Sequence, residues 1–396
     1  MSITERLAKH ANLLVGVGGA GMRIIKDFIN SIALEPLFII NAYLRYYLLD
    51  TYDAWHELIA KREYYNRVHF QQDIIIMTYR LAEGAGAGGC WFSSYEYIKQ
   101  HEKEVTDDVS REIHSPGYTY ILHSFGGGTG SGVGPFLTSK LWEETETEDS
   151  IILPIGSLPH ETEGFRVVNA IATFLRYMNS NIKGLAIFDN RSYYSSSSGG
   201  NVFEAVNVDI FHLIELLSLS NLFGESGEIK SIPKVFDIRD LKCYLLSRTK
   251  DSARPPLIIP CISSWKKSIL NKIRLQVLIA YTIYTSTSTN FYLNPLKVII
   301  VITLPSDLPE QILSSERDYE KIKDYIASHF SLSKEDIGFY VVFTPPQWNR
   351  VDILVLFVDP YIEFLKTVVE KMKEYKHDPI RFIKKYSGGM TYKEKE

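Results

Sequence analysis

The feature that most restricts the fold of this chain is the signature loop, Gly126–Gly132, with the sequence GGGTGSG. It follows the apolar run Tyr118–His123 and precedes the helical pattern Val133–Trp142. Glycines between a buried strand and a helix start predict a tight turn rather than a linker. Gly has no Cβ, so backbone N–H groups of such a loop can approach phosphate oxygens closely. A Cβ at Gly128 is expected to collide with a phosphate or to force an unfavourable backbone conformation. The lysine of the GxxxxGK[ST] loop is missing, which leaves the hydroxyls of Thr129 and Ser131 as the polar side chains.

A second glycine-rich segment, the first loop Val15–Gly21, follows an expected strand at Leu13–Val17 and opens an expected helix at Arg23–Ile32. The free N–H groups and the dipole at a helix start favour a bound anion. The segment also fits the GxGxxG fingerprint, so an NAD-dependent oxidoreductase is a remote alternative. The expected second strand, Leu37–Asn41, ends without the acidic residue that binds the ribose in that class, which counts against it.

Apolar runs alternate with helical patterns through the first two hundred residues, which predicts βαβ units around a Rossmann-like parallel sheet. Further strands are expected at Asp73–Thr78, Tyr118–His123, Ile151–Ile155 and Gly184–Phe188. The segment Arg191–Asn201 is expected to be a mobile loop, and Asn201–Phe223 a long helix that connects two domains.

The second half of the chain predicts a smaller α+β domain. Its expected strands are Pro255–Ile262, Lys297–Thr303, Ile337–Phe343 and Asp352–Asp359, and its expected helices are Ser264–Thr285, Ser314–His329 and Tyr361–Tyr375. We therefore divide the chain into a nucleotide-binding domain (1–202), a central helix (203–223), a C-terminal α+β domain (224–360) and a C-terminal helix with a basic tail (361–396).

Composition excludes several classes of protein. The net charge of −4 argues against general nucleic-acid binding. Cys90, Cys243 and Cys261 lie far apart without a CxxC or Cys/His cluster, which argues against a disulfide framework or a zinc site and fits a reducing cytoplasm. No uninterrupted apolar run reaches 18 residues, so no membrane span is expected.

The signature loop resembles the signature motif of the tubulin/FtsZ superfamily. The first loop resembles the first glycine loop of that family, and the third loop, Gly86–Trp91, resembles its third phosphate loop. The resemblance implies a tubulin-like fold and a GTP site. The nucleotide-binding residues that it implies are Gly18, Gly19, Ala20, Gly21, Asn41, Ala87, Gly88, Gly89, Gly126, Gly127, Gly128, Thr129, Gly130, Ser131, Glu163, Asn190, Phe203 and Asn207.

The residues assigned to the ribose and the base lie outside the glycine loops. The resemblance implies that Glu163 binds the ribose and that Asn190, in Phe188–Arg191, recognises guanine. Phe203 and Asn207 are one helical turn apart and face the same side, as expected of an aromatic ring that stacks on the base and an amide that reads it. Mg²⁺ is expected to come with the nucleotide, and no side chain is assigned to it.

The acidic pair Asp237 and Asp240, within the segment 235–242, resembles the loop that in FtsZ enters the neighbouring subunit's nucleotide site. The pair is expected to orient the water that attacks the γ-phosphate. The resemblance thus implies a GTPase that is activated by head-to-tail polymerisation with copies of itself. A capping role for these residues at a helix start is the alternative.

Three departures from the family pattern favour a second alternative, a nucleotide-binding filament scaffold with little or no hydrolysis. They are Tyr43, where the family has an acidic residue after the second strand, Val167 in place of an arginine, and Val235 in place of an asparagine. The segment after Asp378 carries several lysines and is expected to bind the adjacent subunit or an adaptor.

Overall fold

The structure is a computed structural model. It describes residues 12–32, 44–50, 76–81, 87–113, 117–145, 150–196, 202–223, 236, 238–246, 255–287, 294–308, 316–344, 346, 348–362, 364 and 366.

The strands and helices alternate along the first half of the chain. The strands are β1 (Asn12–Val17), β2 (Leu44–Asp50), β3 (Ile76–Arg80), β4 (Gly117–Ser124), β5 (Ser150–Leu158), β6 (Leu185–Asp189), β7 (Leu257–Lys266), β8 (Lys297–Pro305), β9 (Ile337–Thr344) and β10 (Arg350–Val358). The α-helices are α2 (Gly18–Ile32), α5 (Trp91–Gln100), α6 (Glu102–Glu112), α7 (Gly128–Thr145), α8 (Phe165–Met178), α9 (Asn190–Ser196), α10 (Val202–Phe223), α11 (Ile238–Leu246), α12 (Leu275–Thr287) and α13 (Glu316–Phe330).

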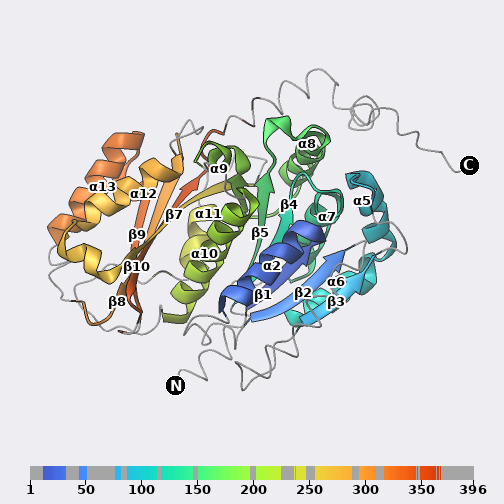
Figure 1. Cartoon of the computed structure of the whole chain (residues 1–396), viewed down its shortest axis with the longest axis horizontal. Coiled ribbons are helices and arrows are strands. Elements are labelled where there is room, and N and C mark those ends of the chain that lie inside the picture. Colours follow the sequence, from blue (N-terminus) through green and yellow to red (C-terminus); the bar gives the residue numbers. More distant parts are fainter. Residues whose placement is uncertain are drawn as a thin grey trace, which may run out of the picture.

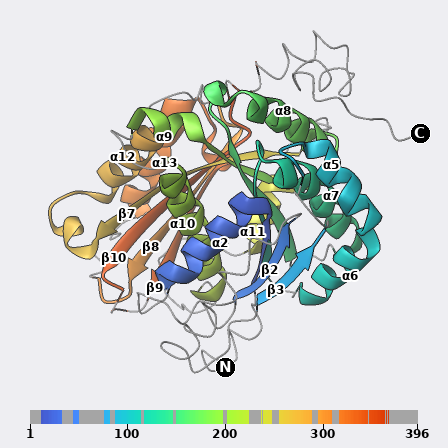
Figure 2. The same cartoon turned by 45° about the vertical axis from the view of Figure 1, so that its right-hand side comes forward.

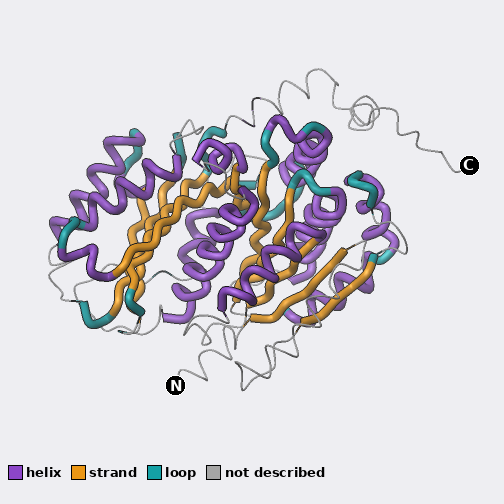
Figure 3. The backbone as a smooth tube through the Cα atoms, in the orientation of Figure 1, coloured by secondary structure: helices purple, strands orange, loops and turns teal. Residues whose placement is uncertain are grey.

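The described strands form one sheet in the order β3-β2-β1-β4-β5-β6-β7-β10-β8-β9 (Figure 3). The strands from β3 to β7 run parallel, whereas β10 is antiparallel to both β7 and β8. The pairing of β6 with β7 is short, with partners only at Leu185–Leu257 and Ala186–Ile258. This short pairing separates the parallel half of the sheet from the mixed half. The domain boundaries given above stay a prediction.

Helices cover both faces of the parallel half. Helices α2 and α10 contact each other on one face (Figure 1), while α5, α6, α7 and α8 contact one another on the other side (Figure 2). Every residue of β1 is buried, because a central parallel strand is covered on both faces. Among the described residues, no helix is long and apolar enough to cross a membrane.

The second strand is not the one that the sequence predicted. The segment Leu44–Asp50 pairs with β1, with Leu48 beside Gly16, and so takes the place assigned to Leu37–Asn41, which lies outside the described residues. A search for apolar runs missed β2 because this strand contains tyrosines, which are usually only partly buried. Tyr46 is nevertheless fully buried here.

Two more segments differ from the prediction. The segment Arg191–Asn201 is not a loop throughout, because α9 occupies Asn190–Ser196. The helix expected at Ser264–Thr285 begins only at Leu275, because β7 stays paired with β10 up to Lys266. The other expected strands and helices that fall within the described residues are confirmed with small shifts of their ends, whereas most of Tyr361–Tyr375 and the tail lie outside the described part.

Candidate nucleotide site

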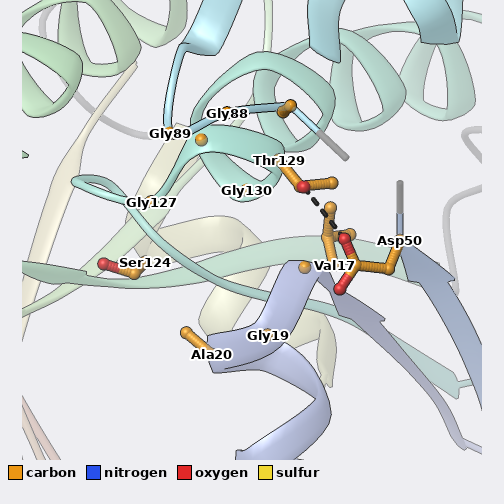
Figure 4. Close-up of a pocket in the computed structure, with 13 residues that line it drawn as sticks. Val17, Gly19, Ala20, Asp50, Gly88, Gly89, Ser124, Gly127, Thr129 and Gly130 are labelled. Carbon is orange, nitrogen blue, oxygen red and sulfur yellow. Dashed lines mark hydrogen bonds between the residues drawn. The ribbon is translucent and has the colours of Figure 1, made fainter. Parts of the chain in front are cut away.

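A cavity of about 310 Å³ lies where β1, β2 and β4 end (Figure 4). Parallel sheets of this order bind ligands at that edge, where the direction of the strand order reverses between β1 and β4. The residues around the cavity are Val17, Gly18, Gly19, Ala20, Asp50, Ala87, Gly88, Gly89, Ser124, Gly127, Gly128, Thr129 and Gly130. The three predicted glycine loops therefore meet around one space.

Helix starts give the cavity its preference for anions. Helix α2 begins at Gly18 and α7 begins at Gly128, and both glycines line the cavity. The first N–H groups of a helix have no intrahelical acceptor, and the helix dipole adds a partial positive charge. Gly18 has a φ of +68°, a conformation that favours glycine, which lets the chain turn from β1 directly into α2. No Lys, Arg or His is among the described residues that line the cavity.

Asp50 is an acidic residue of the cavity that the sequence reasoning missed. It ends β2 and is 5% exposed, and its Oδ1 accepts a hydrogen bond from Thr129 Oγ1 at 2.9 Å. The conclusion that the second strand is followed by no acidic residue was therefore wrong, because it rested on the wrong strand. The argument against an NAD site that used Asn41 fails for the same reason.

The third loop packs against the signature loop. Gly88 and Gly89 have φ values of +58° and +76°, and the loop is closed by a hydrogen bond from Cys90 N to Ala87 O at 2.9 Å. A Cβ added to Gly128 would lie 2.8 Å from Cα and C of Gly89. This Cβ would therefore collide with the neighbouring loop, and its collision with a phosphate stays a prediction.

Three residues of the glycine loops that were assigned to the nucleotide do not line the cavity. A Cβ on Gly21 would lie 2.1 Å from Leu122 O, so this glycine allows α2 to pack on β4. Gly126 packs in the same way against Arg166. Ser131 is buried, and its hydroxyl lies within hydrogen-bond distance of two carbonyl oxygens, Phe125 O at 2.5 Å and Gly127 O, which stabilises the turn from inside.

The residues assigned to the base lie on α9 and α10 and are not among the residues that line the cavity. Phe203 is 40% exposed, and Asn207 Nδ2 donates to Asp27 Oδ2 of α2 at 2.9 Å. Asn190 is buried at the start of α9, and its Oδ1 has no hydrogen-bond partner among the described residues. Asn207 thus links α10 to α2, and the recognition of a purine base by the three side chains stays a prediction.

Glu163 is held by its own segment. Its Oε1 accepts from His160 N at 2.7 Å in a capping box, and its Oε2 pairs with Arg166 Nη1 at 2.8 Å. Asn41, the remaining residue assigned to the nucleotide, lies outside the described residues.

The acidic segment lies far from the cavity of its own chain. Asp240 is in the first turn of α11, and Asp237 lies outside the described residues. Two residues beyond Asp240, Lys242 Nζ lies 5.8 Å from the ring of Trp142, near the C-terminal end of α7. Gly128 starts the same helix at the cavity, so roughly 20 Å of helix separate the two sites.

Comparison with known proteins decides the family. The profile of the Tubulin/FtsZ family, GTPase domain, matches residues 12–198, which contain all three glycine loops. The chain carries a GTPase domain of the Tubulin/FtsZ family. In this domain, the cavity formed by the glycine loops is the candidate site for the nucleotide.

The relatives agree with this assignment. A stretch of 123 residues is 32% identical to the tubulin-like protein CetZ of Thermococcus kodakarensis and covers 30% of this chain and 32% of that protein. The chain therefore spans about a third of the length of the curated relatives that it matches.

Solved structures extend the likeness to nearly the whole chain. CetZ2 from Haloferax volcanii, described as a GTPγS-bound protofilament, superposes with a TM-score of 0.67 at 15% identity, covering 94% of this chain and 99% of that one. The empty FtsZ dimer of M. jannaschii gives 0.60 at 18% identity, with 88% of each chain covered. The predicted fold class is confirmed: a large parallel sheet with additional antiparallel strands, as in tubulin and FtsZ.

Proposed function

We propose that this chain binds GTP in the cavity, polymerises head to tail with copies of itself, and hydrolyses GTP at the contact between subunits. The observation that carries the proposal is the separation between the glycine loops and α11. The loops lie at the N-terminal end of α7, whereas Lys242, two residues after Asp240 in α11, contacts Trp142 near the C-terminal end of α7. Because α11 lies far from the cavity of its own chain, it can complete only the nucleotide site of the next subunit.

The proposed position of GTP follows from the chemistry of the described groups. The glycine loops and the starts of α2 and α7 hold the phosphates through backbone N–H groups. Phe203 stacks on the base, and Asn207 and Asn190 read its polar edge. Glu163 binds the ribose in this proposal. To do so, its carboxylate must release Arg166, with which it forms an ion pair in the structure.

Asp50 fits a divalent cation that accompanies the nucleotide. Mg²⁺ is usually held by one or two carboxylates together with phosphate oxygens, and it neutralises charge on the phosphates when bound. Asp50 is the described carboxylate that lines the cavity. Thr129, whose hydroxyl donates to Asp50, keeps that carboxylate turned toward the signature loop.

The assembly of a relative supports the polymer. CetZ2 of Haloferax volcanii, whose fold this chain shares, is described as a GTPγS-bound protofilament. A contact that joins two different faces of one chain extends without closing, as a filament does. We assign Asp237 and Asp240 to the water that attacks the neighbour's γ-phosphate.

Phosphate release at several protein concentrations tests this proposal. Release per chain should rise steeply above a critical concentration, because each site is completed by a neighbour. Sedimentation should show polymer with GTP and less with GDP. A release rate per chain that does not depend on concentration would contradict completion by a neighbour, and identical sedimentation with GTP, GDP and no nucleotide would contradict the GTP-dependent polymer.

A filament scaffold without hydrolysis is the second candidate. It is favoured by the place of Asp240 in the first turn of α11, where an acidic side chain stabilises a helix start without any catalytic role. This candidate predicts GTP-dependent sedimentation without multiple-turnover phosphate release.

A further inference from the structure

A polar stripe on α8 contacts both the signature loop and the third loop. Asn169, Thr173 and Arg176 are spaced at i, i+4 and i+7, so they share one face of the helix. Asn169 and Thr173 are almost completely buried, although amide and hydroxyl groups are usually exposed. Since a buried polar group needs hydrogen bonds, the partners of this stripe show what it does.

Asn169 links the two loops directly. Its Nδ2 donates to Gly89 O at 2.8 Å and to Gly126 O at 3.0 Å. Ser94 of α5 makes a second link, from its hydroxyl to Gly128 O at 2.7 Å. One amide group thus uses both of its hydrogens to join loops that are about 40 residues apart in the sequence.

The start of α7 depends on this support. Pro135 lies inside α7 and has no N–H, so the carbonyl of Ser131 receives no hydrogen bond from the residue four positions later. Arg176 Nη1 donates to that carbonyl oxygen at 3.3 Å, and Thr173 Oγ1 also lies 3.3 Å from it, although the nearest acceptor of the Thr173 hydroxyl is Asn169 O at 2.8 Å. The glycine-rich first turns of α7, which have a low intrinsic preference for helix, are thereby held by α8.

Arg176 extends the link to α5. Its Nη1 donates to Gly132 O at 2.7 Å, and its guanidinium lies 4.5 Å from the ring centroid of Tyr95 and 5.5 Å from that of Trp91. Burial lowers the pKa of Arg176 to about 10, so the side chain stays charged at neutral pH. A cation against two aromatic faces of α5 fixes that helix, and with it the third loop, beside α7.

We infer that Asn169 is a positioning residue that holds the third loop against the signature loop, so that the phosphate chain meets one preformed wall. The inference rests on the proposed nucleotide site. Asn169 itself lies outside the cavity lining and acts only through the backbone of Gly89 and Gly126. Preorganisation of this kind raises the affinity for the nucleotide, because binding then does not have to supply the free energy that orders the loops.

The test compares Asn169→Ala and Asn169→Asp with a matched control, Thr138→Val. Both Asn169 variants remove the two donors, and the aspartate keeps the shape of the side chain. Thr138 is equally buried and hydrogen-bonds Gly134 O at 2.7 Å, with Tyr177 Oη at 3.4 Å, so its removal weakens the same pair of helices without touching either loop.

Two measurements separate positioning from general damage. GTP and GMP are each competed against a fluorescent GTP analogue. Asn169→Ala should lower the affinity for GTP by about tenfold, the effect of one or two hydrogen bonds. The affinity for GMP should be nearly unchanged, because GMP lacks the outer phosphates. Without nucleotide, hydrogen exchange at the Cys90 amide, which closes the third loop, should accelerate in the Asn169 variants.

The control variant should show neither change. Equal losses of GTP and GMP affinity, or exchange at Cys90 equal to that of Thr138→Val, would overturn the positioning role. If the wild-type protein binds no GTP, the proposed function fails, and the exchange measurement still decides whether Asn169 joins the loops.

Discussion

Replacing Gly128 with alanine tests the contact between the two phosphate loops. The new Cβ would lie 2.8 Å from two backbone atoms of Gly89 and 3.1 Å from Cys90 N. Ordinary carbon contacts are about 3.5–4.0 Å, so the loops must separate by roughly 0.7 Å. The bonds from Ser94 to Gly128 O (2.7 Å) and from Asn169 to Gly89 O (2.8 Å) would then stretch to about 3.4–3.5 Å, which is the limit of a hydrogen bond.

The cost follows from these two bonds. Each contributes about 1 kcal/mol, so the free energy of unfolding should fall by about 2 kcal/mol, within the range for overpacked sites. With a urea m-value of ~3 kcal/mol/M, the midpoint of unfolding should fall by about 0.7 M at an unchanged slope. The assay is urea unfolding of the nucleotide-free protein, followed by circular dichroism.

Gly19→Ala is the matched control. A Cβ at Gly19 has no neighbour within 4 Å, so the urea midpoint should stay within about 0.5 kcal/mol of the wild type. The same Cβ lies at the cavity, so GTP affinity should fall although stability does not. Equal midpoints for the two variants would refute the close contact of the loops.

Three further predictions concern single side chains. Asp50→Asn should retain GTP binding but lose most of its dependence on Mg²⁺, as measured by nucleotide titration with and without EDTA. Burial lowers the pKa of His123 to about 4, below the ~6.5 of an unfolded histidine, so stability should decline by up to about 3 kcal/mol as pH falls from 6.5 to 4; His123→Gln should remove that part of the slope in urea midpoints. Asp240→Ala should keep GTP affinity, slow phosphate release by ~10²-fold and poison wild-type neighbours in mixtures; release at the wild-type rate would make Asp240 a helix-stabilising residue only.

The parts of the fold that the sequence predicted are those with uniform local signals. Strands β1 and β4 are buried on both faces, and their apolar runs reflect that burial directly. Strand β2 was missed because Arg45 and the two tyrosines interrupt its apolar character. The neighbours of β2 explain its composition, since Arg45 pairs with Glu112 of α6 and Tyr46 packs edge-on against Phe28 of α2.

The same contrast applies to the site. The glycine loops are local motifs, so all the cavity-lining residues that they supply, except Val17, were predicted from the sequence. Asp50 depends on where β2 ends, and that required knowledge of its pairing with β1. Asn169 has no sequence signal at all, because a single amide in an amphipathic helix gains its meaning from the carbonyls it reaches.

Asp50 shows why nucleotide and cation should bind together in this cavity. In the proposed complex, the helix starts would attract the phosphate chain, whereas the carboxylate of Asp50, which lies among them, would repel it. At a separation of about 4 Å and an effective dielectric constant of about 20, two unit negative charges repel by about 4 kcal/mol. Such a penalty disappears if a divalent cation lies between the carboxylate and the phosphates. Since coupling between two ligands is reciprocal, the factor by which the cation raises nucleotide affinity is the factor by which the nucleotide raises cation affinity. Asp50 is therefore expected to make the cavity selective for the nucleotide–metal complex over either component alone.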